Sequence, residues 1–133
     1  MAGSKTDALE ARILDHLFKG AASPALGALS TVYVGLHTVV PSDSSGGTEV
    51  VGSGYARVAV AAANWTRTAN SITNNAEVAF PAVTGSAYTV VGFGIYDAST
   101  SGNFLYWGDT TSTTMNVGDV PRYAPSALTV TED

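Results

Sequence analysis

Residues 88–97 have the sequence YTVVGFGIYD, the most strand-like stretch of the chain. Val91, Phe93 and Ile95 alternate there with two glycines and a tyrosine. An alternation of period two is typical of a β-strand, because successive side chains point to opposite faces of a sheet. Glycines on one face of a strand often mark the close approach of another backbone or ring. We therefore expect a strand here, with another group packed against its glycine face.

The residues that follow predict a β-hairpin. Residues 98–103 (ASTSGN) are typical of a turn, and residues 104–107 (FLYW) return as an aromatic strand. We therefore interpret residues 88–107 as one hairpin. Residues 110–117 are expected to form a further strand, followed by a turn at Gly118-Asp119.

Several other segments show strand-like patterns. Residues 31–38 (TVYVGLHT) alternate and predict a half-buried strand, with His37 on the face opposite the apolar residues. Residues 55–62 alternate in the same way. Residues 70–80 indicate two strands around an Asn-Asn turn, and residues 127–131 indicate a last strand with Leu128 and Val130 facing inward.

Two segments between these patterns lack a strand signal. Residues 20–30 (GAASPALGALS) are rich in small residues and are interpreted as a connector. Residues 39–54 contain glycines, serines and a proline, which predicts a flexible Gly/Ser loop. Loops of this length are often functional or disordered.

One helix is expected near the N-terminus, at about residues 6–19. Ser4 and Thr6 are candidate N-caps, and two acids in the first turn complement the helix dipole. Apolar residues recur at helical spacing along one stripe, formed by Leu9, Ile13 and Leu17 and widened by Leu14 and Phe18. A helix this short is marginal alone, so this face is expected to dock on the domain or on a neighbouring subunit.

Together these patterns predict a single domain over residues 1–133. Its fold class is mainly β: an antiparallel β-sandwich of about 7–8 short strands with one N-terminal α-helix. No helical pattern recurs between the strands, so parallel βαβ units are excluded. The 133 residues are enough to bury a hydrophobic core.

Composition narrows the classes of function. Only 13% of residues are charged and the net charge is −5, so the chain lacks the basic stripe that a duplex-binding protein needs, and no nucleic-acid partner is expected. There are no cysteines, which excludes disulfides and thiolate chemistry. No apolar run approaches the roughly 20 residues that span a bilayer, and no signal-peptide pattern follows the N-terminus. A weakly charged surface suits a protein that packs against other copies of itself. The alternative interpretation of this composition is a low-charge extracellular domain.

No residue pattern indicates catalysis. The chain has no nucleophile-elbow, P-loop or dinucleotide motif, so we expect no enzyme, no catalytic residues and no cofactor. His16 and His37 could share a zinc site, but solvated or interface histidines are the alternative. Asp97, Asp109 and Asp119 lie next to turn residues and could form a calcium site, but capping of local backbone N–H groups is the alternative. The second reading is preferred in each case, so no metal is expected. Arg57, the lone charge of its strand, is expected to pair with Glu77 or with a neighbouring subunit.

The order of these segments resembles a family of small tailed-phage virion proteins, often labelled tail fibre proteins. The resemblance rests on TVYVGLHT at 31–38, GSGYARVAV at 52–60, AFPAVTG at 79–85, GFGIYDA at 92–98 and FLYWG at 104–108. It covers nearly the whole chain, although residues 61–71 depart from it. It implies a non-enzymatic structural protein of the virion, assembled in the host cytoplasm, with other virion proteins as partners.

Three hypotheses for the function follow. The first is a capsid decoration or cement protein, a homotrimer on the head that contacts the major capsid protein, and the second is a tail-fibre or tail-tip module that contacts the host. The third belongs to a different class: a carbohydrate-binding or glycan-cleaving domain that recognises a host-surface glycan. Aromatic strand residues are more often core or interface than sugar platforms. The residues expected at a subunit interface are Leu9, Ile13, Leu17, Tyr96, Tyr106 and Trp107.

Overall fold

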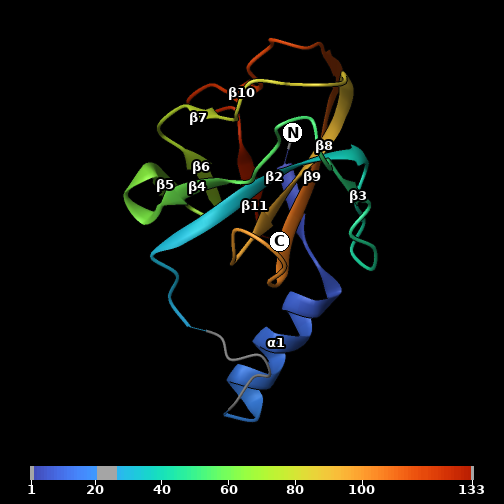
Figure 1. Ribbon diagram of the computed structural model, residues 1–133. Helices are drawn as coiled ribbons and strands as arrows, with labels where there is room; N and C mark the ends of the chain where they lie inside the picture. Colours follow the sequence, from blue (N-terminus) through green and yellow to red (C-terminus); the bar gives the residue numbers. More distant parts are fainter. Residues whose placement is uncertain (1, 21–26, 133) are drawn as a thin grey trace.

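The computed structural model describes residues 2–20 and 27–132 and is mainly β with one helix near the N-terminus, as predicted (Figure 1). The 11 strands exceed the expected seven or eight, because three of them have only two residues. In chain order the elements are β1 (Ala2–Lys5), α1 (Asp7–Phe18), β2 (Thr31–Val39), β3 (Thr48–Glu49), β4 (Val58–Ala61), the 3-10 turn η1 (Ala62–Asn64), β5 (Trp65–Thr68), β6 (Ser71–Asn74), β7 (Val78–Ala79), β8 (Tyr88–Tyr96), β9 (Phe104–Met115), β10 (Arg122–Tyr123) and β11 (Thr129–Thr131). Within the described ranges, no helix is both long and apolar enough to cross a membrane.

Strand β1 joins the two halves of the main sheet. The sheet runs β3-β2-β8-β9-β1-β11-β6-β5, and β4 also pairs with β2. The first half of β1 lies parallel to β11, and Ser4 and Lys5 then pair antiparallel with β9. The remaining strand pairs of the described chain are antiparallel, including a separate two-stranded sheet of β7 and β10.

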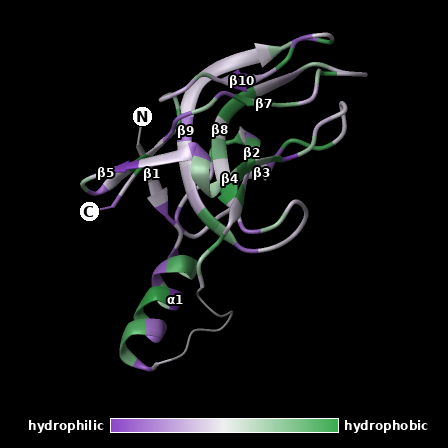
Figure 2. Cartoon of the chain, turned by 90° about the vertical axis from the view of Figure 1, so that its left-hand side faces the viewer, coloured by the Kyte–Doolittle hydropathy of each residue, from purple (hydrophilic) through white to green (hydrophobic). Residues whose placement is uncertain are grey.

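The core forms where these halves face each other. Apolar residues of β2, β4 and β8 belong to the same buried cluster as Leu128 and Val130 beside and within β11. The inward orientation predicted for Leu128 and Val130 is therefore confirmed, with 1% and 6% of each side chain exposed. Figure 2 shows hydrophobic colour along β2, β4 and β8, whereas α1 extends away from the strands.

The predicted hairpin of residues 88–107 is confirmed as β8 and β9, which pair antiparallel over most of their length. The separate strand expected at 110–117 is wrong, because β9 continues without a break to Met115. The pairing register shifts between Val90 and Gly92. A bulge of this kind changes which face a residue occupies, and Val90 enters the core while Val91 stays half-buried.

Other strands differ from the predicted ones where their pairing partners are distant in the sequence. Residues 70–80 form two strands as predicted, but β6 pairs with β5 and β11 while β7 pairs with β10. Strand β5 lies in the segment 61–71, for which no strand was predicted. The stretch 39–54, expected as a loop, contains β3 and the buried Val50. Residues 21–26 of the predicted connector lie outside the described residues.

Candidate functional site

The first turn of α1 is fixed to the β domain. Thr6 is the N-cap, since its side chain accepts a hydrogen bond of 3.3 Å from the Leu9 amide. The same hydroxyl donates to the Phe104 carbonyl at 2.8 Å, and the Thr6 amide donates to the Leu105 carbonyl at 3.0 Å. The Asp7 amide donates to the Asp43 carbonyl at 3.0 Å. Of the two N-cap candidates, Thr6 is thus the cap, because β1 places it against β9.

The later turns of α1 expose their apolar side chains. Leu9 is buried, but the exposed fraction of the residue rises to 57% at Leu14, 69% at Leu17 and 82% at Phe18. The helix ends at Lys19, whose amide donates to the Asp15 carbonyl, and Gly20 follows with φ of +71°. The expectation that the apolar face docks on its own domain therefore holds only for the first turns.

The six expected interface residues fall into three groups. Leu9 and Tyr96 are buried inside their own chain, with Tyr96 stacked on His37 and Phe104. Ile13, Tyr106 and Trp107 are half-buried. Leu17 is exposed. Of the six, Leu17 is thus the residue with the most surface for a partner, and Leu14 and Phe18 lie beside it.

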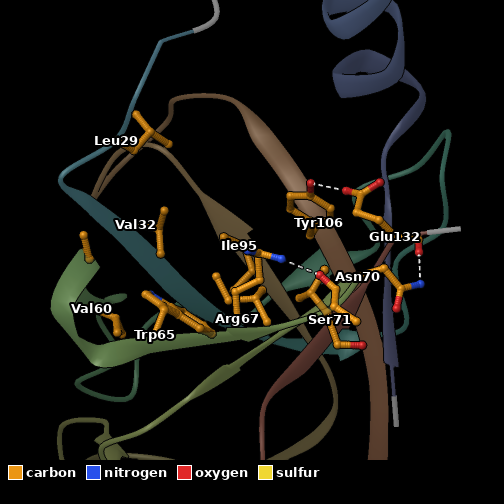
Figure 3. Close-up of a pocket in the computed structure, with 14 residues that line it drawn as sticks. Leu29, Val32, Val60, Trp65, Arg67, Asn70, Ser71, Ile95, Tyr106 and Glu132 are labelled. Atoms are coloured by element: carbon orange, nitrogen blue, oxygen red, sulfur yellow. Dashed lines mark hydrogen bonds between the residues drawn. The ribbon is translucent and has the colours of Figure 1, made fainter.

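A groove of about 460 Å³ opens between the two halves of the sheet (Figure 3). Its walls are mainly apolar and include Val32, Trp65, Ile72 and Ile95. Polar groups lie at its edge, where Glu132 accepts hydrogen bonds from Lys5 and from the Tyr106 hydroxyl. The groove was not foreseen, since its lining comes from strands far apart in the sequence and β5 was missed.

A buried polar network lies on the other face of β2. Arg57 Nε and Nη2 each lie 2.8 Å from a different oxygen of Glu49, and its Nη1 donates to the carbonyls of Ala98 and Ser101. The guanidinium carbon also lies 3.4 Å from the ring centroid of Tyr96. The expected partner Glu77 is wrong: it pairs with Arg122 instead. Arg57 thereby ties β3 to the β8–β9 turn.

The Tyr55 hydroxyl completes this network at the edge of β2. It donates to Glu49 at 2.7 Å and accepts a hydrogen bond of 3.0 Å from the Leu36 amide. That amide lies in the gap between the stretches of β2 that pair with β4 and with β3. A tyrosine side chain thus takes the place of a neighbouring strand for one residue.

Two glycines make room for these rings. Gly35 and Gly94 lie opposite each other in the β2–β8 register. A Cβ added to Gly35 would lie 2.9 Å from the Tyr55 hydroxyl, and one added to Gly94 would lie 2.7 Å from a ring carbon of Phe104. The predicted close approach of other groups to the glycine face of the strand is confirmed.

Burial sets the ionisation of this network. Desolvation lowers the pKa of His37 to about 4, against the opposing charge of Glu49. His37 is completely buried and its Nε2 lies 2.8 Å from the Tyr96 hydroxyl, so the solvated or interface position expected for it is wrong. Desolvation alone would raise the pKa of Glu49, but hydrogen bonds from Arg57 and Tyr55 outweigh it and lower this pKa. The network therefore contains a neutral histidine beside a matched ion pair.

The turn acids cap local backbone groups, as predicted, at two of three positions. Asp97 accepts hydrogen bonds from the amide and the side chain of Asn103, both at 2.6 Å. Asp119 accepts one from the Asn116 amide at 2.8 Å. Asp109 lies exposed within β9 instead. Among the described residues, no group of three or more His, Asp or Glu side chains is arranged to hold a metal ion.

A comparison with protein families identifies the family of this chain. The family model described as Podophage GP4 fiber I protein gp80 matches residues 4–131. No curated protein matches the chain. The match begins in β1 and ends in β11, so it includes the helix, the groove and the buried network. It agrees with the resemblance to small tailed-phage virion proteins found in the sequence. The chain therefore belongs to the Podophage GP4 fiber I protein gp80 family and is a structural protein of a phage virion.

Proposed function

We propose that the chain is a non-enzymatic tail-fibre module that assembles with copies of itself on the outside of the phage particle. The observation that supports this most directly is the exposed apolar edge of α1 on a helix whose first turn is fixed. We call Leu14, Leu17 and Phe18 the helix edge. Apolar side chains this exposed are typical of surfaces that another protein chain covers.

The free energy from burying the helix edge is too small for a stable pair, which favours assembly in several copies. Burial of a Leu or Phe side chain contributes about 1.5–3 kcal/mol, whereas association costs roughly 4–15 kcal/mol. The three residues of the helix edge alone therefore support weak pairing at most. Further contacts, or several copies held at one attachment point, are needed for a stable fibre. The low charge of the chain reduces repulsion between such copies.

The buried network fits a mechanical role. Arg57 joins β3, the start of β4 and the β8–β9 turn through charge-assisted hydrogen bonds, which are stronger than neutral ones. Its donors are used within the chain, so it is not poised to bind a substrate. We interpret this network as a brace that holds the loops of the β domain in place.

Capsid decoration is the second candidate. The absence of a fibrous repeat from this short sequence favours capsid decoration, because a fibre shaft commonly contains such a repeat. The fibre named in the family description favours the tail. Both candidates place the protein in the virion and use the same helix edge, so the location on the particle separates them.

Immunogold labelling of purified virions tests the proposal. Antibodies against the chain should label the tail, and a quantitative gel should give a copy number far below that of the major capsid protein. Labelling over the head, with a copy number comparable to that of the major capsid protein, would overturn the tail assignment in favour of decoration.

A further inference from the structure

Among the described residues, the helix edge and the groove beside Trp65 are apolar surfaces that the chain itself leaves uncovered. We propose that the helix edge of one copy inserts into the Trp65 groove of a second copy. This interface rests on the proposed function, since it supplies the contact by which the module would assemble. Amphipathic helices commonly bind apolar grooves through anchors at i, i+3, i+4 and i+7. Leu14, Leu17 and Phe18 have this spacing.

The groove has the size and lining for such a helix. Its volume of about 460 Å³ lies within the roughly 300–1,000 Å³ of clefts that take a drug-sized ligand. Val32, Val60 and Ile95 form its floor with Trp65, and Leu29 and Ile72 lie nearer the surface, with 44% and 36% of each side chain exposed. Figure 3 shows the labelled side chains of Leu29, Val32, Trp65 and Ile95 around a common space. Apolar anchors would therefore meet apolar walls.

A second copy is needed because α1 is held away from its own groove. The hydrogen bonds of Thr6 and Asp7 to β9 and to the loop at Asp43 fix the direction of the helix. Figures 1 and 2 both show α1 extending outward from the β domain. The groove lies between the halves of the sheet, lined by residues of β2, β4, β5 and β6. The two surfaces therefore do not meet within one chain.

One charge on each surface favours the contact, whereas Glu132 at the groove edge is already paired with Lys5. Arg67 lines the groove, and its Nη1 donates to the Ala69 carbonyl, but no carboxylate of the described chain forms an ion pair with it. Glu10 is exposed and lies one turn before Leu14, on the same side of α1. Placing the helix edge in the groove would bring an acid to the groove that contains this arginine.

The proposed interface is heterologous, because different surfaces of the two copies meet. Such a contact leaves the groove of one copy and the helix edge of the other unoccupied, so it continues from copy to copy. It then closes into a ring or grows as a filament, depending on the rotation between neighbours. Either form suits a fibre component.

Oxidative footprinting by mass spectrometry tests the interface on the unmodified chain. Hydroxyl-radical oxidation of Trp65 is measured across a concentration series that is followed in parallel by analytical ultracentrifugation. Oxidation of Trp65 should fall several-fold as oligomers form, relative to the monomer at the same radical dose. Oligomers in which Trp65 remains as reactive as in the monomer would overturn the proposal and indicate another contact, such as a bundle of helices.

Variants on each side of the contact provide the second test. Leu17→Asp combined with Phe18→Asp should raise the dissociation constant at least tenfold without changing the melting of the monomer, because both side chains are exposed. Ala62→Phe, which fills the groove from an exposed position, should do the same. Val51→Asp is the matched control, since Val51 is 89% exposed and belongs to neither surface.

Exchanging the charges of Arg67 and Glu10 distinguishes a specific contact from non-specific hydrophobic association. Arg67→Glu should weaken assembly, and adding Glu10→Arg should restore it. If Ala62→Phe assembled as well as the wild type, or if the Arg67–Glu10 exchange did not restore binding, the groove would not be the binding site of the helix edge. A chain that stays monomeric at every concentration would also overturn the proposed interface, whereas immunogold labelling decides the proposed function separately.

Discussion

Arg57 and Glu49 form a two-bond ion pair across the edge of the sheet, with both bonds 2.8 Å long. The pair is largely shielded, with 9% of the Arg57 side chain and 24% of the Glu49 side chain exposed. Shielding strengthens the attraction between the charges but makes either charge costly when left alone. The pair therefore matters more for keeping a charge satisfied than for adding net stability.

Replacing one partner of this pair should destabilise the fold. Glu49→Gln leaves the Arg57 charge without its carboxylate, and we expect the free energy of unfolding to fall by roughly 2–4 kcal/mol. The matched control is Glu77→Gln, whose partner Arg122 lies 3.7 Å away with about half of each side chain exposed. That change should cost less than about 1 kcal/mol. Urea denaturation measures both, and equal losses would contradict the role assigned to the Arg57–Glu49 pair.

Adding a methyl group at Gly94 should also destabilise the fold. Its Cβ would lie within 3 Å of Phe104, His37 and Tyr96, and overpacking of this kind costs about 1–3 kcal/mol. Gly27→Ala is the control, because no atom lies within 4 Å of a Cβ built there. Thermal melting should show a lower midpoint for Gly94→Ala alone. A neutral Gly94→Ala would mean that the rings above this strand are loosely packed.

Acid should weaken the fold through His37. Its pKa is about 4 when folded and 6.5 in the reference state, so between these pH values the unfolded chain binds a proton that the folded chain does not. Stability is therefore lost as pH falls from about 6.5 toward 4. A tenfold change in proton affinity corresponds to about 1.4 kcal/mol, so the loss approaches roughly 3 kcal/mol. Glu49, whose pKa is lowered, contributes a further loss at still lower pH.

Urea denaturation between pH 4 and pH 7 checks this prediction. In His37→Gln the dependence on pH over this range should become markedly flatter, because the titrating group is gone. An identical slope in wild type and His37→Gln would show that other groups control the acid sensitivity.

Removing the helix cap should loosen α1. Thr6→Ala deletes the acceptor for the Leu9 amide and the donor to the Phe104 carbonyl, and loss of an N-cap costs about 0.5–2 kcal/mol. Amide hydrogen exchange in residues 9–18 should become faster. Ser4→Ala is the control, because the Ser4 side chain makes an exposed hydrogen bond to the Lys5 carbonyl instead of capping the helix. Similar exchange in both variants would refute the anchoring role of Thr6.

Local patterns were enough to predict the elements whose signals lie within one segment. The alternation in residues 31–38 and 88–107 and the apolar spacing of the helix correctly predicted β2, the β8–β9 hairpin and α1. Strand β5 was missed because WTRT at 65–68 contains one large apolar residue and no clear alternation. Its strand character comes from pairing with β6, for which Trp65 lies opposite Asn74.

The candidate site was predicted only in part. The helical stripe indicated an assembly surface, but the burial of Leu9 beside the exposure of Leu17 follows from the direction in which β1 and Thr6 hold the helix. Tyr96 was expected at an interface and lies inside the chain, because Arg57 and the rings of His37 and Phe104 pack against it. All three come from other segments than β8, so alternation alone could not reveal them.

The sequence by itself determined the strands at residues 31–38 and 88–107, the start of the helix and the acidic net charge of −5, because these depend on periodicity, capping and composition along the chain. The tertiary structure alone decided that Arg57 meets Glu49, that His37 is buried and neutral, and that a groove opens beside Trp65. Each of these requires residues from separate strands to come together. Such contacts are set by strand order and register, which no local pattern of side chains specifies.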